Sequence, residues 1–265
     1  ADYTITAGIP LESPVKACGR YYPERVDDVA WENDLTAFRA YGPALQETGE
    51  RAFGYDIWTK YNTTEPVVEA RYEGELNSDM KAKIAELGKT DPKAAQELYR
   101  SVSYHVDHGN GLDCYKVGPT LGGGTTALMA GDTIIYPYCY ATQEILDNGP
   151  LRFTVKLVYN PLVVKGDSTI IETRIITLDA GSYCNKTVVS YTNLKETMPL
   201  AVGIVLHEPD GAIVADAANG YMTYVDPTDN AGGDNGKIFV GAAFPTLVKE
   251  AKAVLFPEKE KKELR

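Results

Sequence analysis

Alternating apolar and polar residues along much of the chain predict β-strands. In residues 152–159, Phe153, Val155, Leu157 and Tyr159 share one face at a period of two, and mostly polar residues take the other face. Further runs rich in β-branched and aromatic residues cover 133–140, 168–178, 186–191, 200–206 and 237–242. Turn formers separate these runs at 147–150, 165–167, 179–181 and 209–211. Many short strands at this spacing predict an all-β sandwich or barrel.

A short helical insertion interrupts the strand pattern. Ser78 can cap a helix over residues 79–87, which would end at Gly88. Asp91 can cap a second helix, with Pro92 in its first turn. We therefore expect a helical insertion at about residues 78–100. No linker or internal repeat divides the remainder, so residues 1–265 are expected to form a single domain.

The overall charge restricts the partners of the protein. Across 265 residues, 26 Lys and Arg stand against 37 Asp and Glu, a formal charge of −11. Such a surface disfavours nucleic acid and anionic membranes, although a few local cations can still bind an acidic sugar. No apolar run reaches the roughly 18 residues that suggest a membrane-spanning helix. The chain starts at Ala1 without a signal peptide or Met, which fits export, and we expect a periplasmic or secreted protein.

Residues 104–118, called the histidine loop below, carry the densest set of candidate catalytic groups. The segment holds His105, His108, Asp113, Tyr115 and Lys116 among glycines. It is too polar for a core strand and too rich in glycine for a stable helix. Loops that gather titratable side chains are common catalytic sites. The HxxH spacing differs from the HExxH zinc motif, and we expect no metal and no cofactor.

Two further polar clusters, residues 22–43 and 55–60, contain both tryptophans of the chain. Trp31 and Trp58 stand close to carboxylates and cations, a combination that suits sugar binding. The alternative is that both tryptophans belong to the core and that Arg25 and Arg39 form ordinary ion pairs. The remaining candidates in these clusters are Glu32, Asn33 and Lys60.

At these clusters the chain resembles a bacterial family catalogued as domain of unknown function 4861. The matching stretches are residues 25–34, 37–43, 56–60, 104–118, 146–150 and 178–182, so the resemblance runs from about 20 to 210. Asn110 departs from it, since an acidic residue is expected there. The resemblance implies a galactose-mutarotase-like β-sandwich, or supersandwich, with a small helical insertion. Members occur beside polysaccharide-degrading enzymes, and at least one ulvan-degrading relative is an oligosaccharide dehydratase.

The resemblance therefore implies a lyase that removes water from the non-reducing-end uronic acid of an acidic oligosaccharide and leaves a 4,5-unsaturated sugar. Such a reaction requires a cation on the carboxylate, a base for the C5 proton and an acid for the departing hydroxyl. The candidate catalytic residues are His105, His108, Tyr115 and Lys60. The candidate substrate-binding residues are Arg25, Trp31, Glu32, Asn33, Arg39, Trp58, Asp113 and Lys116. The alternatives are a sugar epimerase or mutarotase and a non-catalytic carbohydrate-binding protein.

Overall fold

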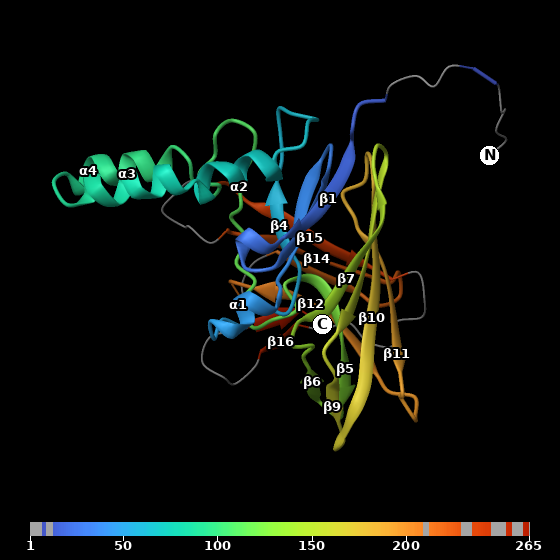
Figure 1. Ribbon diagram of the computed structural model, residues 1–265. Helices are drawn as coiled ribbons and strands as arrows, with labels where there is room; N and C mark the ends of the chain where they lie inside the picture. Colours follow the sequence, from blue (N-terminus) through green and yellow to red (C-terminus); the bar gives the residue numbers. More distant parts are fainter. Residues whose placement is uncertain are drawn as a thin grey trace.

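The computed structural model describes residues 7–8, 13–208, 212–228, 235–244, 253–255 and 262–264. It is mostly β, with four antiparallel sheets and a helical arm that projects from the body (Figure 1). The first sheet has the order β1-β2-β3-β4, formed by Ala17–Tyr22, Asp28–Asn33, Thr36–Ala40 and Asp56–Thr59. The second sheet has the order β11-β10-β8-β7, formed by Lys186–Thr192, Asp167–Asp179, Arg152–Tyr159 and Tyr140–Asn148, with β9 (Leu162–Val164) paired to β10.

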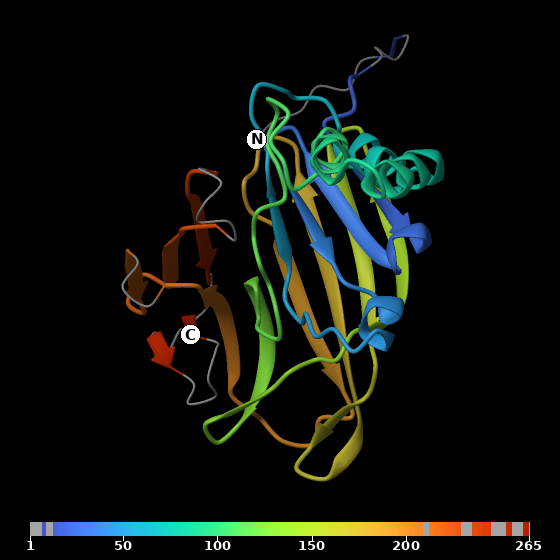
Figure 2. The same ribbon diagram turned by 90° about the vertical axis from the view of Figure 1, so that its left-hand side faces the viewer.

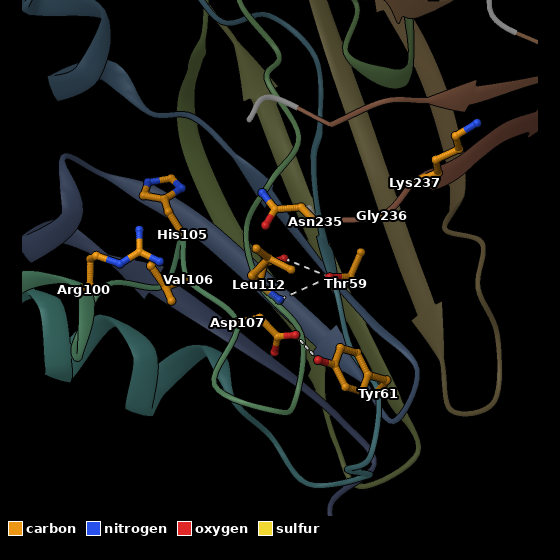
Figure 3. Close-up of a pocket in the computed structure, with 10 residues that line it drawn as sticks. All are labelled: Thr59, Tyr61, Arg100, His105, Val106, Asp107, Leu112, Asn235, Gly236 and Lys237. Carbon is orange, nitrogen blue, oxygen red and sulfur yellow. Dashed lines mark hydrogen bonds between the residues drawn. The ribbon is translucent and has the colours of Figure 1, made fainter. Parts of the chain in front are cut away.

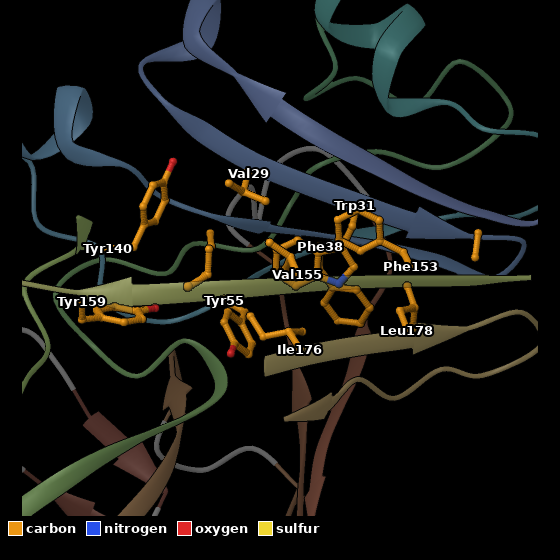
Figure 4. Close-up of a cluster of buried hydrophobic side chains, with 13 residues drawn as sticks. Val29, Trp31, Phe38, Tyr55, Tyr140, Phe153, Val155, Tyr159, Ile176 and Leu178 are labelled. Carbon is orange, nitrogen blue, oxygen red and sulfur yellow. The ribbon is translucent and has the colours of Figure 1, made fainter. Parts of the chain in front are cut away.

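The main core lies between the first and second sheets. Strands β2, β3, β8 and β10 turn alternate residues inward, as the period of two predicts. Trp31 stacks between Phe38, at 5.9 Å between ring centroids, and Phe153, at 6.3 Å. Figure 4 shows these rings with Ile176 and Leu178 of β10. This packing turns the opposite residues of β2 to β4 toward the outer face of the first sheet.

Two further sheets are present in the described residues. The third sheet has the order β16-β17-β12-β5-β6, formed by Ala253–Leu255, Lys262–Leu264, Leu200–Leu206, Gly123–Ala130 and Thr133–Ile135. The fourth has the order β13-β14-β15, formed by Ile213–Asp216, Tyr221–Asp226 and Ile238–Ala243, and lies beside β12 (Figure 2). A parallel bridge from Tyr55 to Gly122 joins the first and third sheets.

In the described ranges, five helical segments lie outside the sheets: η1 (Pro23–Arg25), α1 (Pro43–Glu47), α2 (Val68–Leu76), α3 (Ser78–Gly88) and α4 (Pro92–Arg100). Helix α2 covers part of the outer face of the first sheet through Val68 and Tyr72, and α3 and α4 form the projecting arm. Asp91 caps α4 as predicted, with its side chain accepting from Ala94 N. The cap of α3 is Asn77, not Ser78, because the Asn77 side chain accepts from Met80 N.

The prediction of an all-β sandwich is confirmed. Strands β8 and β12 match the predicted ranges 152–159 and 200–206, and β10, β11 and β15 differ from theirs by a residue at one or both ends. The range 133–140 is divided between β6 and the start of β7. The turn at 209–211 lies outside the described residues. The helical insertion starts earlier than predicted, at α2.

Candidate functional site

A buried arginine organises the outer face of the first sheet. The alternation that sends Phe38 inward sends Arg39 outward, where its Nη2 donates to Asp56 Oδ2 at 2.5 Å and to Asp113 Oδ2 at 2.8 Å. Arg39 Nη1 lies 3.7 Å from Asp28 Oδ2. All four side chains are almost fully buried. A buried cation shared by carboxylates from β2, β4 and the histidine loop joins these segments into one cluster.

Burial and charge oppose each other at Asp28. Its side chain is wholly buried, and desolvation raises its pKa from 3.8 to about 7, although the nearby charges of Arg39 and Arg25 lower it. The hydroxyl of Tyr72 donates to Asp28 Oδ2 at 3.2 Å. Near neutral pH this carboxyl therefore changes charge within the cluster.

The histidine loop is fixed along β4. The Thr59 backbone N–H donates to Leu112 O at 3.0 Å, and Trp58 and Asp113 form an isolated bridge. Gly111 has a φ of 96°, and a Cβ there would lie 2.0 Å from Thr59 O. Only glycine allows both this positive φ and this close approach to Thr59, so Gly111 lets the loop pack closely against the sheet.

A cleft of about 690 Å³ opens between this loop, the end of β3 and the segment after α1. Its lining is rich in cations and includes the phenols of two tyrosines: Arg25, Arg39, Tyr41, Arg51, His105, Asp113, Tyr115 and Lys116 are among the residues that form it. Of the predicted candidates, the cleft brings together Arg25, Arg39, His105, Asp113, Tyr115 and Lys116. The remaining candidates lie elsewhere.

Two of the cations are suited to holding an anionic ligand. Arg25 Nε donates to the hydroxyl of Tyr104 at 3.0 Å. Within the part of the chain that the structure describes, neither Arg25 nor Lys116 has an ion pair with a carboxylate. Arg39 differs, because Asp56 and Asp113 already occupy its Nη2. A guanidinium without a carboxylate partner binds a planar carboxylate best.

The surroundings of His105 fix its tautomer. Its Nδ1 lies 3.1 Å from the backbone oxygen of Asp113, and a carbonyl oxygen can only accept, so Nδ1 carries the proton. The neutral ring therefore has its basic lone pair on Nε2. The Asp113 carboxylate, 3.7 Å from Nδ1 and held by Arg39, also favours this orientation. A ring in this tautomer can accept a proton at Nε2.

The two tyrosines of the cleft differ in what their hydroxyls can do. Tyr115 donates its proton to Gly122 O at 2.9 Å, so that proton is committed to the backbone. The hydroxyl of Tyr41 instead accepts from Arg39 Nη2 at 3.3 Å and donates its own proton to no acceptor among the described residues. Burial raises the pKa of Tyr41 well above its usual range, although the charge of Arg39 lowers it, so the phenol stays protonated. Sequence reasoning missed Tyr41, and its position two residues after Arg39 on the same side of the strand was the available signal.

The other histidines are placed differently. His108 is exposed, its Nε2 donates to Ser103 O at 2.9 Å, and it lies outside the residues that line the cleft. In His207 both nitrogens face acceptors, with Nδ1 2.6 Å from Asp226 Oδ2 and Nε2 2.7 Å from Lys116 O. Burial opposes the charged ring and is the largest single effect, but the hydrogen bond and charge of Asp226 together with the hydrogen bond to the Lys116 backbone exceed it, so the pKa of His207 is raised above 6.5. His207 therefore holds the backbone of Lys116 beside the cleft.

The tryptophans have no free face for a sugar. Trp31 has 0% of its surface exposed and lies in the core between the sheets, with its indole N–H donating to Asn185 Oδ1 at 2.8 Å. Trp58 is 1% exposed and packs beneath the cluster, where its indole N–H donates to Asp56 Oδ2 at 3.0 Å. The structure places both where the core alternative expects them, because burial removes the surface on which a ring could stack. We leave them out of the ligand-contacting set.

Three other predicted candidates form a structural junction. Lys60 Nζ donates to Glu32 Oε2 at 2.7 Å and to the backbone oxygens of Asn33, at 2.7 Å, and Glu65, at 2.9 Å. Glu32 also accepts from Val67 N and Val68 N at the start of α2. The side-chain oxygen of Asn33 accepts from Leu35 N and Thr36 N in the turn between β2 and β3. These side chains lie away from the cleft, with their polar groups already bonded.

Among the described residues, no group of three or more His, Cys, Asp or Glu side chains is arranged to hold a metal ion. His105 and His108 both direct a ring nitrogen to backbone oxygens, which occupies one nitrogen on each. That the protein needs no metal stays a prediction. No helix in the described ranges is long and apolar enough to cross a bilayer.

Fold and site together define an all-β sandwich protein with a cationic cleft on the outer face of one sheet. The chain belongs to the family described as domain of unknown function DUF4861, whose model matches residues 3–264. The match extends beyond the stretch from 20 to 210 in which the resemblance was visible. No solved structure matches the sequence.

One relative is an uncharacterised protein, P7, of Formosa agariphila. It is 28% identical over 227 residues, which cover 83% of this chain and 51% of that protein. The chain thus spans about half the length of the curated relative that it matches.

Proposed function

We propose that this protein is a carbohydrate-active dehydratase that eliminates water from the non-reducing-end uronic acid of an oligosaccharide. The observation that carries the proposal is one cleft that contains an orientated imidazole, a protonated phenol and two cations that have no carboxylate partner among the described residues. The resemblance to ulvan-degrading relatives suggests an ulvan-type oligosaccharide. A polymer-derived substrate also supports a periplasmic or secreted location, which fractionation of the producing cells would test.

The reaction uses four side chains of the cleft. Arg25 and Lys116 bind the uronate carboxylate and stabilise the negative charge that develops beside C5. Nε2 of His105 takes the C5 proton, and the electron pair of the C–H bond forms the C4–C5 double bond. Tyr41 donates its proton to the departing C4 hydroxyl, which leaves as water. Solvent then returns the two side chains to their starting protonation.

Arg39 and Asp113 act indirectly in this scheme. Arg39 holds Asp113, and Asp113 accepts the Nδ1 proton of His105 through its backbone oxygen. The pair keeps the basic nitrogen of His105 pointed away from that carbonyl. Both are positioning residues.

The test is an elimination assay with uronate-terminated oligosaccharides. The product is expected to absorb in the ultraviolet, where a conjugated 4,5-unsaturated uronate absorbs, and to have lost the mass of one water. His105→Gln should lower turnover roughly 10²–10⁴-fold, the usual range for general acid–base catalysis. His108→Gln, a matched change three residues along the chain and outside the cleft lining, should keep the wild-type rate.

The same assay separates the alternatives. An isomer of unchanged mass, without ultraviolet absorbance, would show an epimerase or mutarotase. Bound but unchanged sugar would show a carbohydrate-binding protein. A His105→Gln variant that turns over as fast as wild type would refute the proposed base.

A further inference from the structure

A second hollow adjoins the cleft. It has a volume of about 410 Å³ and shares His105 with the cleft, so the proposed base stands between the two spaces. Figure 3 shows its lining, with Arg100 and Val106 on the side of His105 and Asn235 to Lys237 facing them. Thr59 and Leu112 also line it. The proposed chemistry, which needs one sugar in the cleft, leaves this space unused.

The charge of the second hollow is positive. Arg100, the last residue of α4, and Lys237, directly before β15, are both exposed. Among the described residues, neither has an ion pair with a carboxylate. The one lining carboxylate, Asp107, is engaged, since Oδ1 accepts from the backbone N–H groups of Gly109 and Gly111. The hollow thus has two cations without a described carboxylate partner and one carboxylate whose Oδ1 already accepts two hydrogen bonds.

The hollow also presents an aromatic face. Tyr61 is 43% exposed, and its hydroxyl donates to Asp107 Oδ2, as the dashed line in Figure 3 marks. The hydrogen bond holds the ring in place while leaving much of its surface free. A fixed and exposed phenol ring packs well on the C–H groups of a sugar, the role that the two buried tryptophans cannot take.

We propose that the second hollow binds the sugar next to the terminal uronic acid and selects an anionic substituent on it. Tyr61 packs against the ring of that second sugar. Arg100 and Lys237 bind the carboxylate or sulfate ester that it carries. The inference rests on the proposed function, because it takes the terminal sugar to lie in the cleft, and it adds a requirement for charge on the second residue.

The test compares three oligosaccharides that share the same terminal uronic acid. Their second sugars carry a carboxylate, a sulfate ester or no charge. Binding is measured by calorimetry in a His105→Gln background, where bound sugar is not converted. Adding Arg100→Gln and Lys237→Gln together should weaken binding of the charged ligands about tenfold or more and leave the uncharged ligand unchanged. The preference between carboxylate and sulfate ester names the substituent.

Two further variants serve as controls. Arg152→Gln removes an exposed cation that pairs with Asp179 and lines neither space, and it should leave every affinity unchanged. Lys237→Glu should weaken the charged ligands more than Lys237→Gln does. Arg152 and Lys237 are both exposed, so neither substitution should disturb the fold, and circular dichroism will verify this for each variant.

The two proposals can fail separately. Binding that depends on Arg100 and Lys237, with no unsaturated product formed by the wild-type protein, would refute the proposed chemistry and keep the second site. Unsaturated product together with equal binding of charged and uncharged ligands would refute the second site and keep the chemistry. Loss of binding that is the same for all three ligands would also overturn the selection of an anion.

Discussion

Replacing Asp28 with Asn should stabilise the protein increasingly as the pH rises from about 4 to about 7. The folded pKa of Asp28 is raised from 3.8 to about 7, chiefly by burial. The folded protein therefore holds this proton more tightly than the unfolded chain does. Unfolding releases the proton within that range, so the contribution of Asp28 to stability falls as the pH rises through it.

The magnitude follows from the size of the pKa shift. The interval between 3.8 and about 7 spans about three pH units, each worth about 1.4 kcal/mol. Above pH 7 the ionised carboxylate of Asp28 thus costs about 4 kcal/mol relative to its protonated form below pH 4. Asn keeps the shape and can still accept from Tyr72, which donates to Asp28 in the wild type. The substitution therefore removes the pH-dependent contribution of Asp28 to the free energy of unfolding and changes little else.

The assay is urea unfolding of wild type and Asp28→Asn at several pH values between 4 and 8. Intrinsic fluorescence suits it, because Trp31 and Trp58 are buried and become exposed on unfolding. Glu97→Gln, at an exposed position on α4, is the matched control and should show no such trend. A free-energy difference between Asp28→Asn and wild type that stays flat across this range would refute the reasoning.

Three further predictions concern the site. Tyr41→Phe should lower turnover roughly 10²–10⁴-fold with little change in substrate affinity, measured by steady-state kinetics; a normal rate would exclude the phenol as the acid. Arg39→Met leaves Asp56 and Asp113 buried without their cation and should cost about 3–5 kcal/mol in the free energy of unfolding; a normal denaturation midpoint would contradict it. For His207, whose folded pKa is raised above 6.5, the stabilisation is fully present below 6.5 and is lost as the pH rises through the folded value. The difference in the free energy of unfolding between wild type and His207→Gln, measured by urea unfolding, should therefore shrink with rising pH. A difference that grows with pH would contradict a raised pKa of His207 in the folded protein.

Strands β8, β10 and β11 of the second sheet could be predicted from the sequence because their packing repeats every two residues. Strand β8 follows this rule, with Phe153, Val155 and Leu157 facing the core. Strands β2 and β3 were not predicted as strands, because their outer residues are charged and buried, Asp28 and Arg39 among them. A strand is usually recognised by apolar residues on a buried face and polar residues on a solvent-exposed face. Strands β2 and β3 are buried on both faces and carry charged residues on one of them, so they do not show this pattern.

The remaining misses depend on contacts that are distant in sequence. Helix α2 starts at backbone groups capped by Glu32 of β2, more than thirty residues earlier, so no local cap marks it. The histidine loop could be predicted as a site from its composition, whereas the different positions of His105 and His108 within it could not. His105 lines the cleft beside the Asp113 carboxylate and His108 does not, a difference between two exposed histidines that the sequence presents as equivalent.

Arg39 makes the histidine loop and the first sheet a single unit for protein engineering. Its guanidinium joins Asp113 of the loop to Asp56 of β4, so a loop grafted from a relative must bring a carboxylate at that position. A graft without it would leave the orientation of His105 unsupported even if every cleft-facing residue were copied. Substrate range is therefore best altered at the exposed positions of the second hollow, Arg100 and Lys237, while residues 39, 56 and 113 are transplanted together.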